Sequence, residues 1–281
     1  MNTKVIKTDM REDVVKAKNL TVGYKDKKIW QSANFEVKRG EFVAVIGPNG
    51  AGKTTMFRML LGLQEPVSGD LKVFGEPPMR GNQRIGYVPQ RHTIDNETNI
   101  ECIELVHLAI SGHKWGIGLT SSKEKELAYK ALKDVGAAEL AHKSLASLSG
   151  GELQRIFLAE ALVSNPEMLL LDEPLSNLDI KRASDLVSLI DSVVQSRKVT
   201  TFLVAHDINP LIQFLDKVIY IANGKVATGT PKEVLTSKKL SELYGTHVEV
   251  LHDSMGHILI HSVYGMNEQP PDEEEHHDVE R

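Results

Sequence analysis

From residue 43 the chain reads Val43-Ala44-Val45-Ile46-Gly47-Pro48-Asn49-Gly50-Ala51-Gly52-Lys53-Thr54-Thr55. The first four residues are apolar and mostly β-branched, which predicts a buried strand. A glycine-rich turn follows, and the apolar run Met56-Phe57-Arg58-Met59-Leu60-Leu61 after it predicts a helix. The sequence therefore predicts a strand, a tight turn and a helix in immediate succession.

The turn between this strand and this helix has the composition of a phosphate-binding loop. Its three glycines let backbone N–H groups converge on one point, toward which the positive end of the helix dipole also points. The pattern places Lys53 to reach β- and γ-phosphates and the Thr54 hydroxyl to bind Mg²⁺. An ordinary glycine-rich turn is the alternative, which the flanking strand and helix disfavour. The residues predicted to bind nucleotide here are Gly47, Pro48, Asn49, Gly50, Ala51, Gly52, Lys53, Thr54 and Thr55.

Two carboxylates follow a second apolar run, Met168-Leu169-Leu170-Leu171-Asp172-Glu173. A strand without polar alternation is buried on both faces, which predicts a parallel sheet between layers of helices. Ligands bind at the carboxyl ends of such strands. Asp172 suits Mg²⁺, directly or through water, and Glu173 is a candidate base for an attacking water. A solvated strand end is the alternative, and the phosphate-binding loop disfavours it because such a loop needs an acidic partner.

A second glycine turn lies at Leu148-Ser149-Gly150-Gly151-Glu152, before an apolar helix. Adjacent glycines and a serine at a helix N-terminus offer N–H groups and a hydroxyl to an anion, although this turn contains no lysine. Taken alone, the turn is better explained as a helix capped by Ser149. The two interpretations stay open at this point.

Two further residues are candidates because of where they stand relative to the loop and the strands. His206 follows the apolar strand predicted at 200–205, where it is placed to donate a hydrogen bond to a terminal phosphate. Tyr24 lies about twenty residues before the loop, where an aromatic face can stack on a purine. The alternatives are a structural hydrogen bond for His206 and ordinary strand packing for Tyr24.

Local patterns predict several other elements. Val14–Ala17 and Leu20–Val22 favour two short strands, which a lysine-rich turn follows. The stretch from 91 to about 146 has helical patterning, including a helix opened by Ser121 in which Leu127 shares the buried face. Asn223-Gly224 between two apolar runs predicts a type I′ hairpin.

Composition limits the class of protein. The chain has 281 residues, a formal charge of −5 and one cysteine, Cys102. There is no basic footprint, so we expect no nucleic-acid partner, and a lone cysteine suits a reducing compartment. The start of the chain has no long apolar stretch, so we expect no signal peptide. The apolar runs elsewhere are strand-sized, so any membrane role must come through a separate partner.

These motifs, in this order, resemble the nucleotide-binding subunit of ABC transporters over residues 14–240. The resemblance implies an α/β P-loop NTPase (RecA-like) core with an antiparallel β subdomain and an inserted helical subdomain at about 91–160. Residues 241–281 are then a C-terminal extension, with a short β hairpin and a disordered tail rich in His and acidic residues. The matching positions are Tyr24, Gly47–Thr55, Gln90, Leu148–Glu152, Asp172-Glu173, Ser176–Asp179 and His206.

The resemblance also implies a mechanism and partners. ATP and Mg²⁺ are the expected ligands, and two copies are expected to pair head to tail. An integral membrane permease would rest on the helical subdomain at the cytoplasmic face of the membrane, with a solute-binding protein as an indirect partner. The expected catalytic residues are Lys53, Gln90, Glu173 and His206, the Mg²⁺ ligands are Thr54, Gln90 and Asp172, and the nucleotide contacts from the second copy are Ser149, Gly150, Gly151 and Glu152.

The cargo is addressed by weaker similarities. The run from Gln90 to Asp95, and Tyr244-Gly245 followed by strands near 247–251 and 257–263, resemble the importer branch for manganese, zinc or iron. Import of another solute such as an iron chelate or cobalamin, export, or a soluble ABC protein without a transport role are the alternatives. The tail with His276 and His277 beside acidic residues is either metal-sensing or simply disordered.

Overall fold

The protein is described by a computed structural model over residues 12–24, 27–90, 100–111, 122–176, 178–254 and 257–262. Its centre is a six-stranded sheet in the order β5-β6-β7-β3-β8-β9. Neighbouring strands run parallel from β5 to β8, and β9 is antiparallel to β8. The strands are β3 (Phe42–Ile46), β5 (Ile85–Val88), β6 (Met168–Asp172), β7 (Thr200–Ala205), β8 (Lys217–Ala222) and β9 (Lys225–Gly229).

Both faces of this sheet are covered, which explains the unbroken apolar runs. Successive side chains of a strand point to opposite faces. Leu169 and Leu171 pack in one apolar cluster with α4 (Gly150–Leu162) and α5 (Ile180–Arg197). Met168 and Leu170 pack in another, with α1 (Lys53–Leu60). The predicted parallel sheet between two layers is confirmed.

An antiparallel sheet in the order β2-β1-β4 lies against the α1 face. Its strands are β1 (Asp13–Tyr24), β2 (Lys27–Lys38) and β4 (Ser68–Val73). The prediction of two short strands is wrong here, and residues 25 and 26 of the lysine-rich turn predicted after Tyr24 lie outside the described residues. The two pieces are one strand, whose register against β2 shifts near Asn19, a residue with φ of 48°. The lysines at 27 and 28 begin β2 itself, with exposed side chains.

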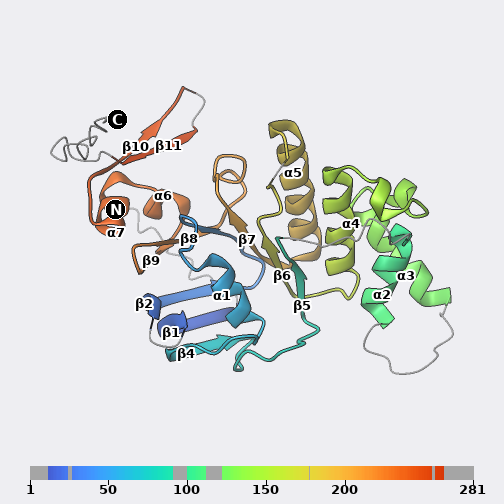
Figure 1. Ribbon diagram of the computed structural model, residues 1–281, viewed down its shortest axis with the longest axis horizontal. Helices are drawn as coiled ribbons and strands as arrows, with labels where there is room; N and C mark the ends of the chain where they lie inside the picture. The colour runs from blue at the N-terminus through green and yellow to red at the C-terminus, as the bar shows by residue number, and fades with distance from the viewer. Residues whose placement is uncertain are drawn as a thin grey trace, which may run out of the picture.

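The helical segment occupies one end of the molecule, beyond α4 (Figure 1). It contains α2 (Cys102–Ser111), α3 (Ser122–Asp134) and the 3₁₀ turns Ala138–Leu140 and Leu145–Ser147. The predicted positions 91–99 and 112–121, including the capping residue Ser121, lie outside the described residues. Of the residues predicted in the buried face of α3, Ala131 and Leu132 are buried, together with Ala128, whereas Leu127 is 41% exposed.

The C-terminal part returns to the opposite end of the core sheet (Figure 1). The predicted type I′ turn is confirmed, because Asn223 and Gly224 between β8 and β9 have φ of 49° and 73°. Two short helices follow, α6 (Pro231–Val234) and α7 (Ser237–Tyr244), and then the antiparallel pair β10 (Val248–His252) and β11 (Ile258–Ser262). The tail from 263 lies outside the described residues. Among the helices described, none is both long enough and apolar enough to cross a bilayer.

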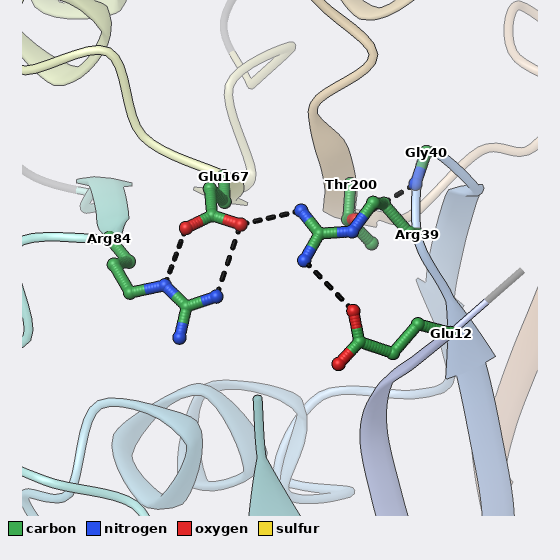
Figure 2. A network of polar contacts seen from close by, with 6 residues as sticks. All are labelled: Glu12, Arg39, Gly40, Arg84, Glu167 and Thr200. Carbon is green, nitrogen blue, oxygen red and sulfur yellow. Dashed lines mark hydrogen bonds and ion pairs between the residues drawn. The ribbon is translucent and has the colours of Figure 1, made fainter. Parts of the chain in front are cut away.

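A polar network ties together segments at the amino end of the core sheet (Figure 2). Glu167 precedes β6, and its carboxylate accepts two hydrogen bonds from Arg84, at 2.5 and 3.1 Å, and one from Arg39 at 2.5 Å. Arg39 also pairs with Glu12 at 3.3 Å. Hydrogen bonds from these two guanidinium groups, Arg84 first, lower the pKa of Glu167 to about 2. The network therefore fastens the antiparallel sheet to the core.

Candidate active site

The glycine loop follows β3, whose five residues are all buried. Two of its glycines are required by close contacts. A Cβ on Gly47 would lie 2.0 Å from the carbonyl oxygen of Ile221, and one on Gly52, where φ is 97°, would lie 2.8 Å from Ile29 and 2.9 Å from Trp30 Nε1. Only glycine lets the loop curl this tightly against its neighbours. The backbone is therefore shaped as a cradle at the N-terminus of α1.

Lys53 is the first residue of α1 and is 5% exposed. Its ammonium group donates to the carbonyl oxygens of Gly47, at 2.8 Å, and Pro48, at 3.1 Å. Burial lowers the pKa of Lys53, while the charges of Glu173 and Asp172 act in the opposite direction. The lysine is thus held inside the loop by backbone oxygens, where a phosphate oxygen is a stronger acceptor.

Asp172 is the last residue of β6 and is almost completely buried, with 1% of its surface exposed. The Thr54 hydroxyl donates to its Oδ1 at 3.4 Å. Burial raises the pKa of Asp172. The hydrogen bond from Thr54 acts in the opposite direction, and the charge of Glu173 raises this pKa further. A buried carboxylate beside a hydroxyl is a set of hard oxygen donors, so these two residues fit Mg²⁺.

Glu173 connects three strands at their carboxyl ends. Its φ of 53° lies in the left-handed region, which is strained for a residue with a side chain, and such strain concentrates at functional sites. Gln90, two residues after β5, donates to its Oε2 at 2.6 Å. His206, directly after β7, places Nε2 2.9 Å from its Oε1. The carboxylate is therefore oriented between an amide and an imidazole.

Lys53, Thr54, Gln90, Glu173 and His206 surround one cavity of about 530 Å³ at the carboxyl ends of the parallel strands, which Asp172 does not line. The structure thus brings together most of the predicted nucleotide and catalytic residues. Ile29 of β2 also lines this cavity, and no sequence motif marks it because the lysines beside it favour a turn. The lining residues are Ile29, Asn49, Gly50, Gly52, Lys53, Thr54, Thr55, Gln90, Glu173 and His206.

The second glycine turn does not line this cavity. Ser149 caps α4, because its side chain accepts a hydrogen bond from the N–H of Glu152 at 3.5 Å. In return, the Glu152 carboxylate accepts hydrogen bonds from the Ser149 backbone N–H at 2.8 Å and from its hydroxyl at 2.7 Å. The hydrogen bonds from Ser149 lower the pKa of Glu152. Above Gly150 there is open space, and a Cβ on Gly151 would meet only the side chain of Arg182, at 3.7 Å. Tyr24 ends β1, and its side chain lies outside the described part of the chain.

A lysine-bearing glycine loop that faces a buried acid across a parallel sheet defines the class of P-loop nucleotide hydrolases. The comparisons with known proteins identify the family within this class. The family model described as "ABC transporter" matches residues 30–176, just over half of the chain. The chain belongs to the ABC transporter family, in which it is an ATP-binding subunit and an ATPase.

Individual relatives match over most of their own length. The manganese transport system ATP-binding protein MntB of Bacillus subtilis is 33% identical, over 86% of this chain and 96% of the relative. The zinc import ATP-binding protein ZnuC of Vibrio vulnificus is 32% identical, over 83% of each chain. A solved structure of a dimeric ATP-binding cassette in a post-hydrolysis state, bound to ADP and Pi, is 29% identical with a TM-score of 0.65, covering 77% of this chain and 98% of that one.

Proposed function

We propose that this ATPase drives import of a divalent transition metal through a separate integral membrane permease, and that it hydrolyses ATP between two copies of itself. The observation that carries the ATPase part is the cavity in which the glycine loop and the ends of β5, β6 and β7 converge. The names of the relatives, which transport manganese or zinc, support the cargo. Attachment to a permease would hold the chain at the cytoplasmic face of the membrane, with a solute-binding protein as an indirect partner.

Within one copy, each residue around the cavity has a proposed role. Lys53 leaves the carbonyl groups that it contacts here and binds the β- and γ-phosphates of ATP. Thr54, Asp172 and Gln90 hold Mg²⁺, which neutralises phosphate charge when it is bound. Glu173 then orients or deprotonates the attacking water. His206 donates a hydrogen bond to the γ-phosphate. Its ring is within reach because it lies beside Glu173 and lines the same cavity as the glycine loop.

The nucleotide site is completed by a second copy in a head-to-tail dimer. Ser149, Gly150, Gly151 and Glu152 lie away from the cavity of their own chain, and the open space above Gly150 leaves the start of α4 free to approach a phosphate. The dimeric relative bound to ADP and Pi supports this arrangement. Tyr24 is proposed to stack on the base. The lysine-free turn would thus supply N–H groups to a phosphate that the other copy already binds.

The cargo is tested by deleting the gene in the organism that encodes it and measuring total manganese, zinc and iron in cells grown at limiting metal. We expect the content of at least one of these metals to fall several-fold. The wild-type gene should restore the metal content, and so should a gene with Glu167→Gln at the other end of β6. A gene with Glu173→Gln should not restore it. Unchanged metal contents together with lost uptake of cobalamin or an iron chelate would replace the metal cargo by that solute.

The deletion strain also distinguishes a transport role from the role of a soluble ABC protein. When a tagged wild-type chain is expressed in it and purified in mild detergent, an integral membrane protein should co-purify with the chain. Hydrolysis of ATP without any such companion, and without a change in metal content, would leave the ATPase assignment intact and remove the transport role.

A further inference from the structure

His206 needs a fixed position to act on the γ-phosphate, and its own surroundings do not provide one. Half of its side chain is exposed, at 49%, and the contact to Glu173 is made by one ring nitrogen. His206 also follows the end of β7, so the strand ladder no longer holds it. The contacts of the residues that come next in the chain therefore decide how firmly the backbone of His206 is held.

Asn209, three residues later, fastens this loop to the C-terminal hairpin formed by β10 and β11. Its Oδ1 accepts from the N–H of Ile258 at 2.7 Å, and its Nδ2 donates to the carbonyl oxygen of the same residue at 3.0 Å. The side-chain amide thus pairs with β11 as another strand would. The Nδ2 group also donates to Asp207 Oδ1 at 3.0 Å, and the Asn209 backbone N–H donates to that oxygen at 2.9 Å. The loop is consequently locked both internally and to the hairpin.

Apolar packing reinforces the same junction. Ile208 and Ile258 are buried, at 5% and 6% exposure, and belong to one cluster that also contains Ile46 of β3. The two isoleucines line a small cavity, of about 260 Å³, together with His206 and Asp207. The loop that carries His206 therefore rests on the hairpin through both polar and apolar contacts.

The hairpin is itself fixed to the body of the protein. The N–H groups of Val248 and Val250 donate to Ser241 and Ser237 of α7, each at 2.9 Å. At its turn, His257 donates its backbone N–H to Asp253 at 2.8 Å, and its ring lies 2.7 Å from the same carboxylate. Asp253 and His257 line a cavity of about 650 Å³ that extends to Glu173 and His206. The hairpin is thus a braced support beside the active site.

We propose that Asn209 is a positioning residue for His206, through which the C-terminal hairpin holds the imidazole beside Glu173. This proposal rests on the role assigned to His206 in the proposed function. Asn209 does not line the cavity around Lys53, so it should influence the hydrolysis step and leave nucleotide binding unchanged. A small displacement of a reacting group is enough to slow a reaction strongly.

The test compares Asn209→Ala with Asn223→Gly. Asn223 also ties the C-terminal part to the core, because its Nδ2 donates to the carbonyl oxygen of Tyr244, but it does so from the turn between β8 and β9 and not from the β7 loop. Its φ of 49° is one that glycine accepts. We expect Asn209→Ala to lower kcat for ATP about tenfold with KM within twofold, and Asn223→Gly to leave both values within twofold. Thermal melting of both variants measures any loss of folded protein.

A same-size variant removes the hydrogen-bond donor of Asn209 without leaving a hole. Asn209→Asp turns the donor into a carboxylate oxygen that faces the Ile258 carbonyl and Asp207, so we expect kcat to fall at least as far as in Asn209→Ala. If both substitutions at 209 leave kcat within twofold of wild type, or if KM rises in proportion as kcat falls, the proposal is overturned.

The NMR signal of the His206 ring provides a readout that is independent of hydrolysis. This signal should shift or broaden in Asn209→Ala and Asn209→Asp. It should be unchanged in Asn223→Gly. An unchanged signal in both variants at position 209 would contradict the proposal. His206→Ala separates this proposal from the proposed function. If that variant hydrolyses ATP like wild type, the role of His206 fails, while the ring signal still decides whether Asn209 positions it.

Discussion

The carboxylates at the two ends of strand β6 lie in opposite electrostatic environments. Glu167, just before its first residue, is paired by Arg84 and Arg39, and its pKa falls to about 2. Asp172, its last residue, is buried beside a hydroxyl, and burial raises its pKa. Lys53, whose charge acts on the pKa of Asp172, donates its hydrogen bonds to backbone oxygens.

This difference separates structural charge from functional charge on one strand. A carboxylate with its cations already in place contributes to the stability of the fold. A buried carboxylate without one costs stability, and it persists where a ligand supplies the missing positive charge. The amino end of the core sheet is therefore complete by itself, whereas the carboxyl end holds the buried carboxylate of the proposed Mg²⁺ and phosphate site.

The largest expected effect comes from Glu173→Gln. The amide keeps the size of the side chain but cannot take a proton from water, so we expect hydrolysis to slow by about a hundredfold or more. ATP affinity should stay within about threefold, because Lys53 and the glycine loop are unchanged. Phosphate release and equilibrium binding of ATP measure the two quantities.

Glu167→Gln is the matched control at the other end of the strand. It should keep the hydrolysis rate within about twofold of wild type, because its partners Arg39 and Arg84 lie far from the cavity lining. Equal losses of activity at both ends would abolish the distinction between the two carboxylate sites.

Asp172→Asn should weaken the use of Mg²⁺. The amide still accepts from Thr54, but it lacks the charge that a hard cation prefers. We expect the Mg²⁺ concentration for half-maximal hydrolysis to rise about tenfold or more. An unchanged Mg²⁺ dependence would remove Asp172 from the proposed metal site.

Asp172→Asn and Glu167→Gln should change the free energy of unfolding in opposite directions. Asp172→Asn relieves the burial of a charge and should raise the free energy of unfolding by about 1 kcal/mol. Glu167→Gln loses a half-exposed charge network and should lower it by about 1 kcal/mol. Denaturant unfolding at neutral pH without nucleotide measures both, and a change of the same sign in the two variants would be inconsistent with the comparison.

The smallest expected effect is the pH dependence that Glu167 contributes. Because its pKa is lowered from 4.5 to about 2, its stabilising contribution is fully present above about pH 4.5 and is lost as the pH falls toward 2. Wild type and Glu167→Gln should therefore converge in unfolding free energy between these pH values. A difference that stays constant over this range would assign the effect of Glu167 to packing.

Much of the fold and of the site was predictable because it depends on local pattern. The loop before α1, the unbroken apolar strands β6 and β7 and the turn at Asn223 each have a short signature whose physics is contained in a few residues. Parallel strands also bring their carboxyl ends to one edge, so Asp172, Glu173 and His206 were expected to be neighbours.

The features that the sequence does not predict depend on contacts between distant residues. Strand β2 begins with exposed lysines and pairs with β1 through a shifted register, so it has no clean alternation to detect. The clamp from Asn209 joins positions 49 residues apart, and the bonds from Arg39 and Arg84 to Glu167 span 128 and 83 residues. No local pattern encodes such pairs.

The proposed mechanism requires that ATP be shared between the glycine loop of one copy and the lysine-free turn of another. The direct measurement is the mass of Glu173→Gln in solution with ATP and Mg²⁺, by light scattering after gel filtration. We predict twice the chain mass of 31.1 kDa with ATP, and a single chain with ADP or when Ser149→Arg is added to block the turn. A single chain at saturating ATP, or a dimer indifferent to nucleotide and to Ser149→Arg, would contradict the shared site.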